Sequence, residues 1–97
     1  MALRSMGTAT FWQQYLALPE PIRQLAQVAY RQFLQDPWHP SFHRKKPGAL
    51  ARLHPPIYEF RLSRQYRALC QVDGEAYCWV FIGDHVAFDR EVRRLAR

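Results

Sequence analysis

Arg67 and His85 are the two residues of this 97-residue sequence whose types suit a definite reaction. A guanidinium stays charged at any physiological pH, and its planar fork of N–H groups matches phosphate oxygens. An imidazole titrates near neutrality and can act as acid or base. Cleavage of RNA by its own 2′-hydroxyl needs a base, an acid and cations around the phosphorus. Arg67 and His85 would suit that reaction if the fold brings them together.

Basic residues are concentrated in one part of the chain. The net charge is +6, and residues 43–67 hold seven basic residues against one acidic residue, so the whole excess lies there. The basic residues are Arg44, Lys45, Lys46, Arg52, Arg61, Arg64 and Arg67, and the acidic one is Glu59. This segregation predicts a site for a polyanion.

A plainer interpretation of these residues is also open. The basic segment could be a solvated surface, and Lys45 and Lys46 ordinary surface lysines. Arg67 could pair with a carboxylate such as Glu59 or Asp84, and His85 could be a helix N-terminal or turn residue without chemistry.

Three predicted strands must position the candidate residues. Residues 57–62 and 66–72 alternate between apolar and polar, and residues 76–82 are apolar throughout. Asp73-Gly74 between the last two predicts a type I′ hairpin turn, which needs positive φ at both central residues. That turn would place four pairs on one aromatic face: Val72 with Glu75, Cys70 with Tyr77, Ala68 with Trp79, and Tyr66 with Phe81. The other face would carry Arg67, Leu69, Gln71, Ala76, Cys78, Val80 and Ile82, with His85 where the last strand ends.

Two helices are predicted to cover the aromatic face. Thr10 can cap a helix over residues 11–18, and Pro21 opens a second helix that ends near Asp36. Residues 1–8 form a loose start, and residues 86–95 a short terminal helix. Residues 37–56 contain five of the seven prolines and form an irregular segment, with a possible edge strand at 42–46.

The predicted fold class is therefore α+β, with a single domain over residues 1–97. A two-helix antiparallel hairpin packs on a small twisted antiparallel sheet of three to four strands, followed by the short C-terminal helix.

Other chemistries find little support in the sequence. The four histidines and two cysteines match no zinc spacing, so we expect no metal and no cofactor. Cys70 and Cys78 lie within predicted strands and on opposite faces, so neither a nucleophile nor a disulfide is expected. No apolar run is long enough for a membrane span, and the first ten residues do not form a signal peptide. We expect a reduced, cytoplasmic protein.

Several segments, in order, resemble the RelE/ParE superfamily of bacterial type II toxin–antitoxin toxins. They are "DPWHPSFHRKK", "YEFRLSRQYRAL" and "WVFIGDHVAFD", and the likeness to the compact RelE-like branch covers roughly residues 10–92. The resemblance implies two helices on a twisted antiparallel sheet. It further implies a toxin that cuts mRNA in the ribosomal A site without metal and so inhibits translation. Its partners would be a cognate antitoxin, the ribosome and mRNA.

The resemblance also assigns roles by position. Arg67 of "YRAL" matches a phosphate-binding arginine, and Arg61 of "FRLS" falls where a second basic residue often stands. Lys45 and Lys46 lie where lysines contact RNA or act as base. His85 lies near the end-of-strand arginine or histidine. We therefore predict Arg67, His85 and Arg61 as catalytic residues, and Lys45, Lys46 and Arg64 as substrate-binding residues.

Two departures from the family leave a rival hypothesis. Phe88 stands where many members have a tyrosine, which in some acts in catalysis, so that role would be lost or pass to His85. Most members begin with an edge strand, and Met1–Thr8 is a weak candidate for one. The rival is a non-nuclease protein of this fold, either a ParE-like inhibitor of DNA gyrase or a degenerate toxin that only binds its antitoxin. A basic RNA-binding module without toxicity is a third possibility.

Overall fold

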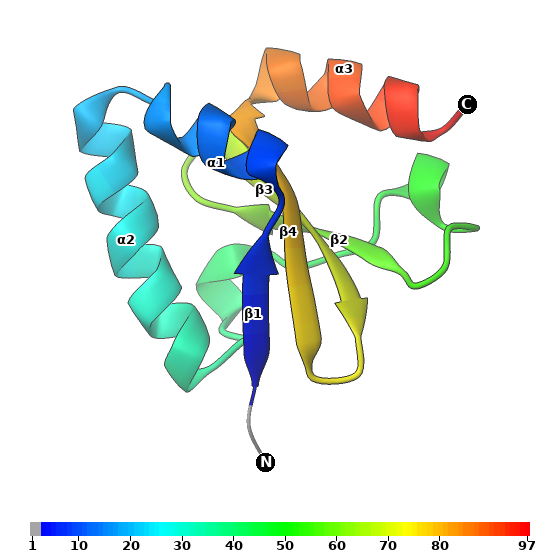
Figure 1. Ribbon diagram of the computed structural model, residues 1–97, viewed down its shortest axis with the longest axis horizontal. Coiled ribbons are helices and arrows are strands. Elements are labelled where there is room, and N and C mark those ends of the chain that lie inside the picture. The colour runs from blue at the N-terminus through cyan, green and yellow to red at the C-terminus, as the bar shows by residue number, and fades with distance from the viewer. Residues whose placement is uncertain (1–2) are drawn as a thin grey trace.

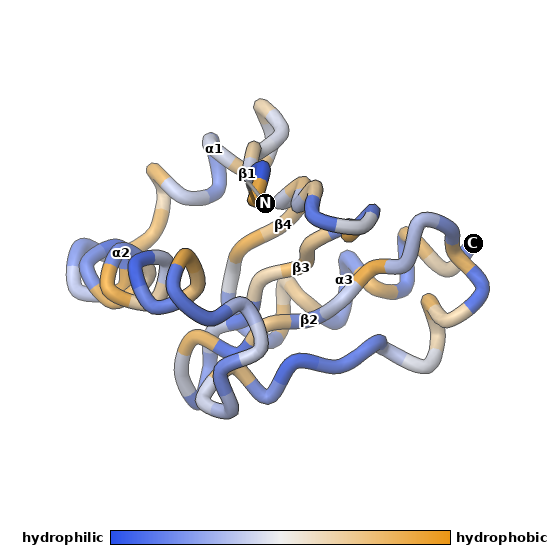
Figure 2. The backbone as a smooth tube through the Cα atoms, turned by 90° about the horizontal axis from the view of Figure 1, so that it is seen from below, coloured by the Kyte–Doolittle hydropathy of each residue, from blue (hydrophilic) through white to orange (hydrophobic). Residues whose placement is uncertain are grey.

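The computed structural model describes residues 3–97, which form a four-stranded sheet and three α-helices. The sheet order is β1-β4-β3-β2. Figure 1 shows the path of the chain, and Figure 2 shows α2 and α3 on opposite sides of the strands. In chain order the elements are β1 (Arg4–Gly7), α1 (Ala9–Leu16), α2 (Glu20–Gln35), β2 (Ile57–Arg61), β3 (Tyr66–Asp73), β4 (Ala76–Asp84) and α3 (His85–Leu95). The predicted α+β class is confirmed.

The expectation of a loose start at residues 1–8 is wrong where the structure describes it, and residues 1 and 2 lie outside the described part. Strand β1 runs parallel to β4 and forms the edge of the sheet. The Arg4 backbone N–H donates to the Glu75 carbonyl at 2.9 Å, and the Trp79 indole N–H donates to the Ser5 hydroxyl at 3.0 Å. The sheet is therefore mixed rather than purely antiparallel. β1 also supplies the edge strand that seemed to be missing.

Thr8, and not Thr10, caps α1. Its hydroxyl accepts a hydrogen bond from the Phe11 backbone N–H at 3.0 Å, so α1 begins at Ala9. This arrangement satisfies one of the free N–H groups of the first turn. Helix α2 has Pro21 within its first turn, as predicted, and ends at Gln35.

The β3–β4 hairpin turns one residue later than predicted. Asp73 pairs with Ala76, so Gly74 and Glu75 form the loop, and Gly74 has φ +62°. A glycine with positive φ at the first central position is typical of a type II′ turn. Next to the turn the shift moves the predicted partners by two residues, so that Val72 now faces Tyr77 and Cys70 faces Trp79. Because side chains alternate with a period of two, this shift keeps each residue on its predicted face.

A bulge in β4 then overturns the predicted faces of two residues. Leu69 pairs with Phe81, whereas the next residue, Cys70, pairs with Trp79, so Val80 is the extra residue. Beyond the bulge Phe81 lies on the α3 side and Ile82 on the α1–α2 side, the reverse of the prediction.

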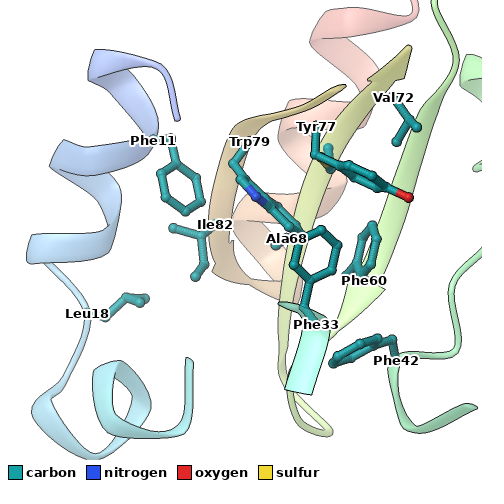
Figure 3. Packing of buried hydrophobic residues seen from close by; sticks show 11 residues of the cluster. Phe11, Leu18, Phe33, Phe42, Phe60, Ala68, Val72, Tyr77, Trp79 and Ile82 are labelled. Carbon is teal, nitrogen blue, oxygen red and sulfur yellow. The ribbon is translucent and has the colours of Figure 1, made fainter. Parts of the chain in front are cut away.

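Two apolar clusters cover the two faces of the sheet. The larger one lies under α1 and α2, where Phe33 packs edge-on against Phe60, Tyr77 and Trp79 at ring-centroid distances of 5.8, 4.9 and 5.2 Å (Figure 3). The prediction that the two helices cover the aromatic face is confirmed. The smaller cluster lies under α3 and consists of Leu50, Ile57, Leu69 and Phe81.

The segment between α2 and β2 is irregular, as predicted. It contains two short 3₁₀ turns, Pro40–Phe42 and Gly48–Leu50. The possible edge strand at residues 42–46 reduces to one antiparallel bridge between Lys45 and Glu59, so the segment runs along the outer edge of β2.

Candidate nucleic-acid interface

Arg61 and Arg67 are directly opposite each other across β2 and β3. Both lie on the α3 side of the sheet, because Leu69, two residues after Arg67, belongs to the cluster under α3. Directly opposed like charges destabilise a sheet. Among the described residues Arg61 forms no ion pair. The strand register therefore puts two basic residues at directly opposed positions, an arrangement that lowers stability.

Arg67 is held in a fixed position. Its Nη1 donates to the carbonyl oxygens of Ser63, Arg64 and Tyr66 at 2.6, 3.2 and 3.1 Å. Its Nε lies 3.6 Å from a carboxylate oxygen of Glu59, whose side chain is only 12% exposed. These contacts use Nη1 and Nε, and no described residue accepts a hydrogen bond from Nη2. The predicted alternative of an Arg67–Glu59 ion pair is confirmed, and the guanidinium keeps one nitrogen for an anion.

Glu59 links the arginine pair to the lysines. Its backbone N–H donates to the Lys45 carbonyl at 2.7 Å, and its carbonyl accepts from the Lys45 N–H at 3.3 Å. A groove of about 440 Å³ lies between the 45–49 segment and α3. The residues of this groove that carry charge are Lys45, Lys46, Glu59, Asp89 and Arg93. Glu59 thus contacts Arg67 through its carboxylate and Lys45 through its backbone.

His85 is the first residue of α3 and its side chain is exposed. Asp84 caps this helix, since its carboxylate accepts from the Ala87 N–H at 2.8 Å. Gly83, two residues before His85, pairs with Arg67 across the sheet. The register therefore puts His85 at the same end of the sheet as the two arginines, as the sequence predicted.

The other arginines of the basic segment are either exposed or bound to other parts of the fold. Arg64 is exposed in the loop between β2 and β3. Arg52 donates to the Ala96 carbonyl at 2.9 Å and so fastens the end of α3. Arg44 is packed among aromatic rings. The sequence could not show that the Arg44 and Arg52 side chains contact other parts of the same chain.

Three groove residues were missed by reasoning from sequence. Glu59 appeared only as a possible ion-pair partner, and Asp89 and Arg93 only as members of the terminal helix. Their spacing carries no motif, because the groove forms between segments that lie far apart in the sequence. The one available signal was Glu59, the single acidic residue in a run of seven basic ones.

Neither cysteine is in a reactive setting. Burial raises the pKa of the Cys70 thiol far above its ordinary value, and Cys78 lies in β4 opposite Gln71. Within residues 3–97, no three histidine, cysteine or acidic side chains gather closely enough to hold a metal ion. No helix in the described part of the chain is long and apolar enough to cross a membrane.

Comparisons with known proteins match the chain in fold and not in sequence. No protein-family model matches it, and no curated protein is significantly similar to it. A chain of the RelB-RelE antitoxin-toxin complex from Methanococcus jannaschii gives a TM-score of 0.70 at 15% identity, over 89% of this chain and 96% of that one.

Two Escherichia coli structures give the same result. The DinJ-YafQ toxin-antitoxin complex matches with a TM-score of 0.71 at 4% identity, over 89% of this chain and 97% of that one. The RelBE toxin-antitoxin complex matches with a TM-score of 0.64 at 20% identity, over 86% of this chain and 96% of that one. The chain therefore shares the fold of these toxin–antitoxin structures, which confirms the fold that the resemblance implied.

Proposed function

We propose that the chain is the toxin of a type II toxin–antitoxin pair and that it inhibits translation by cutting mRNA on the ribosome. The fold of toxins such as RelE and YafQ supports the first part. The opposed pair of Arg61 and Arg67 carries the second. Two like charges at adjacent positions lower stability unless an anion sits between them, and a phosphodiester is such an anion.

The site offers a group for each part of the cleavage. The Arg61 guanidinium and Arg67 Nη2 would bind the scissile phosphate and stabilise the charge that builds up on it. Glu59 or His85 would take the proton of the 2′-hydroxyl, while its oxygen bonds to phosphorus. The bond from phosphorus to the 5′-oxygen then breaks. The other member of the Glu59–His85 pair, in its protonated form, would donate a proton to that oxygen. The products are a 2′,3′-cyclic phosphate and a 5′-hydroxyl, so no metal or cofactor is required.

The exposed cations would hold the flanking RNA. Lys45 and Lys46 lie along the groove beside Glu59, and Arg64 lies in the loop next to the arginine pair. Each would bind a phosphate without reading sequence. On this proposal the protein acts in the cytoplasm, and the ribosome supplies the mRNA in an extended form.

A cognate antitoxin is the proposed protein partner, since the matched structures are antitoxin complexes. It would cover the basic face with acidic side chains and so compete with RNA for the same guanidiniums.

One observation favours the non-nuclease rival. The Phe88 ring packs against Phe81 at a centroid distance of 6.3 Å and lines the groove without any hydroxyl. A groove of this kind could bind a protein such as the antitoxin or DNA gyrase without doing chemistry.

The test is expression of the chain in bacteria, followed by mapping of mRNA 5′ ends. Cuts within translated codons that disappear in Arg61→Ala and His85→Ala support the nuclease. Growth arrest with induction of the DNA-damage response and intact mRNA supports the gyrase inhibitor. A wild-type chain that is not toxic but still binds its antitoxin supports the degenerate toxin.

A further inference from the structure

We propose that Trp38 is a stacking platform for a base of single-stranded RNA, on the opposite side of β2 from the arginine pair. The inference rests on the proposed function and adds a second contact region for the same substrate. It is carried by the way in which Arg44 holds the indole, by the exposure of the indole and by the charge around it.

Arg44 forms the base of this platform. Its guanidinium carbon lies 3.4 Å from the centroid of the Trp38 ring and 4.5 Å from that of Tyr58. Nη1 donates to the Pro37 carbonyl and to the Tyr77 hydroxyl, both at 3.1 Å. The guanidinium is therefore fixed from behind and attracts the indole through a cation–π contact.

Trp38 is held firmly and yet remains exposed. Its backbone N–H donates to the Asp36 carboxylate at 3.0 Å, and its ring meets Tyr58 edge-on at 5.8 Å. In spite of these contacts the residue is 59% exposed. A large aromatic ring that is both immobilised and exposed loses little entropy on binding, and every nucleobase has a π face that can stack on it.

The surrounding charge favours RNA over an apolar protein segment. Lys46 Nζ lies 6.0 Å from the Tyr58 ring centroid, next to the platform, and Lys46 also lines the groove near Glu59. Lys45, one residue earlier, bridges to Glu59 on the edge of β2. A strand of RNA that leaves the arginine pair and crosses this edge would meet the two lysines and then the indole. Basic side chains interleaved with aromatic rings are typical of single-strand binding.

The experiment measures binding of a fluorescein-labelled eight-nucleotide single-stranded RNA to the purified chain by anisotropy. A matched oligonucleotide with abasic sites retains the phosphates and lacks the bases. Trp38→Ala should weaken binding of the RNA about fivefold or more, the effect of losing one stacked base. The same substitution should leave binding of the abasic oligonucleotide unchanged.

Two further variants control for folding. Trp38→Phe keeps a ring over Arg44 and should retain most of the affinity. Trp12→Ala removes an indole exposed to a similar degree, 50%, on α1 and should change nothing. Equal RNA binding by Trp38→Ala and wild type overturns the inference. An equal loss of affinity for both oligonucleotides also overturns it. The same holds if Trp38→Ala weakens binding of a partner protein and leaves RNA binding unchanged.

The outcome also separates this inference from the proposed function. If Arg61→Ala weakens RNA binding and Trp38→Ala does not, only the platform fails. If the wild-type chain binds no RNA, both fail.

Discussion

Replacement of Arg61 by alanine should separate activity from stability. Arg61 lies opposite Arg67 and forms no ion pair among the described residues, so its removal breaks no ion pair there. It also removes a cross-strand repulsion that costs about 0.2–1 kcal/mol. Arg61→Ala should therefore be as stable as wild type or slightly more stable. Its cleavage rate should fall about 10²–10³-fold, the usual effect of losing one group that stabilises developing charge.

Arg67→Ala provides the contrast, because Arg67 has structural contacts as well. Its loss frees the carbonyls of Ser63 and Arg64 and leaves the largely buried Glu59 carboxylate without its partner, whereas the Tyr66 carbonyl still accepts from the Leu62 backbone N–H. Leaving such groups unpaired costs about 1–3 kcal/mol. Arg67→Ala should thus lose both activity and stability.

Urea denaturation followed by tryptophan fluorescence gives the stabilities, and ribosome-dependent cleavage of a short mRNA gives the rates. Arg31→Ala, an exposed substitution of the same kind on α2, is the matched control and should change neither quantity. The stabilising effect of Arg61→Ala should shrink as salt is added, because salt screens the repulsion. Two results would refute the reasoning: full activity in Arg61→Ala, or a loss of stability as large as that of Arg67→Ala.

Three other predictions concern the fold. Phe33→Ala should destabilise the chain by about 3–5 kcal/mol in urea, because Phe33 is 2% exposed and packs against four other aromatic rings; a loss below 1 kcal/mol would contradict this packing. Thr8→Ala should cost about 0.5–2 kcal/mol in the same assay through loss of the α1 cap, and Thr10→Ala should cost less. Burial raises the pKa of the Cys70 thiol, so its reactive thiolate is scarce throughout pH 7–9. A thiol reagent should therefore label Cys70 only after unfolding, and rapid labelling of the native protein would show that the site is open.

Local patterns in the sequence were enough to predict most elements of the fold. The alternation in residues 57–62 and 66–72 and the prolines around α2 predicted strands and a helix close to those observed. The errors arose where two local signals competed. Gly74 can serve a type I′ turn as its second central residue or a type II′ turn as its first, and the sequence does not distinguish them. The bulge at Val80 has no signal in a strand that is apolar at every position.

The candidate site, like the fold, has features that the sequence predicted and features that it did not. The clustering of basic residues located the face, and the strand register brought Arg61 opposite Arg67. Charge counting could not show which cations remain available, because Arg44 and Arg52 make their contacts with residues distant in sequence. It also treated Glu59 as a minor exception, whereas in the structure the Glu59 carboxylate pairs with Arg67 and the Glu59 backbone pairs with that of Lys45.

The arrangement of these charges also bears on how the protein would be controlled. Arg61 and Arg67 repel each other in the free protein, and Glu59 offsets the repulsion only on the Arg67 side. An anion that binds between them relieves the repulsion, whether it is an RNA phosphate or a carboxylate of an antitoxin. Because both would need the same guanidinium nitrogens, they cannot bind together. If each ligand bound the folded state only, each would also stabilise it by mass action. Inhibition by a partner and protection from unfolding would therefore arise from one contact, with no conformational change required.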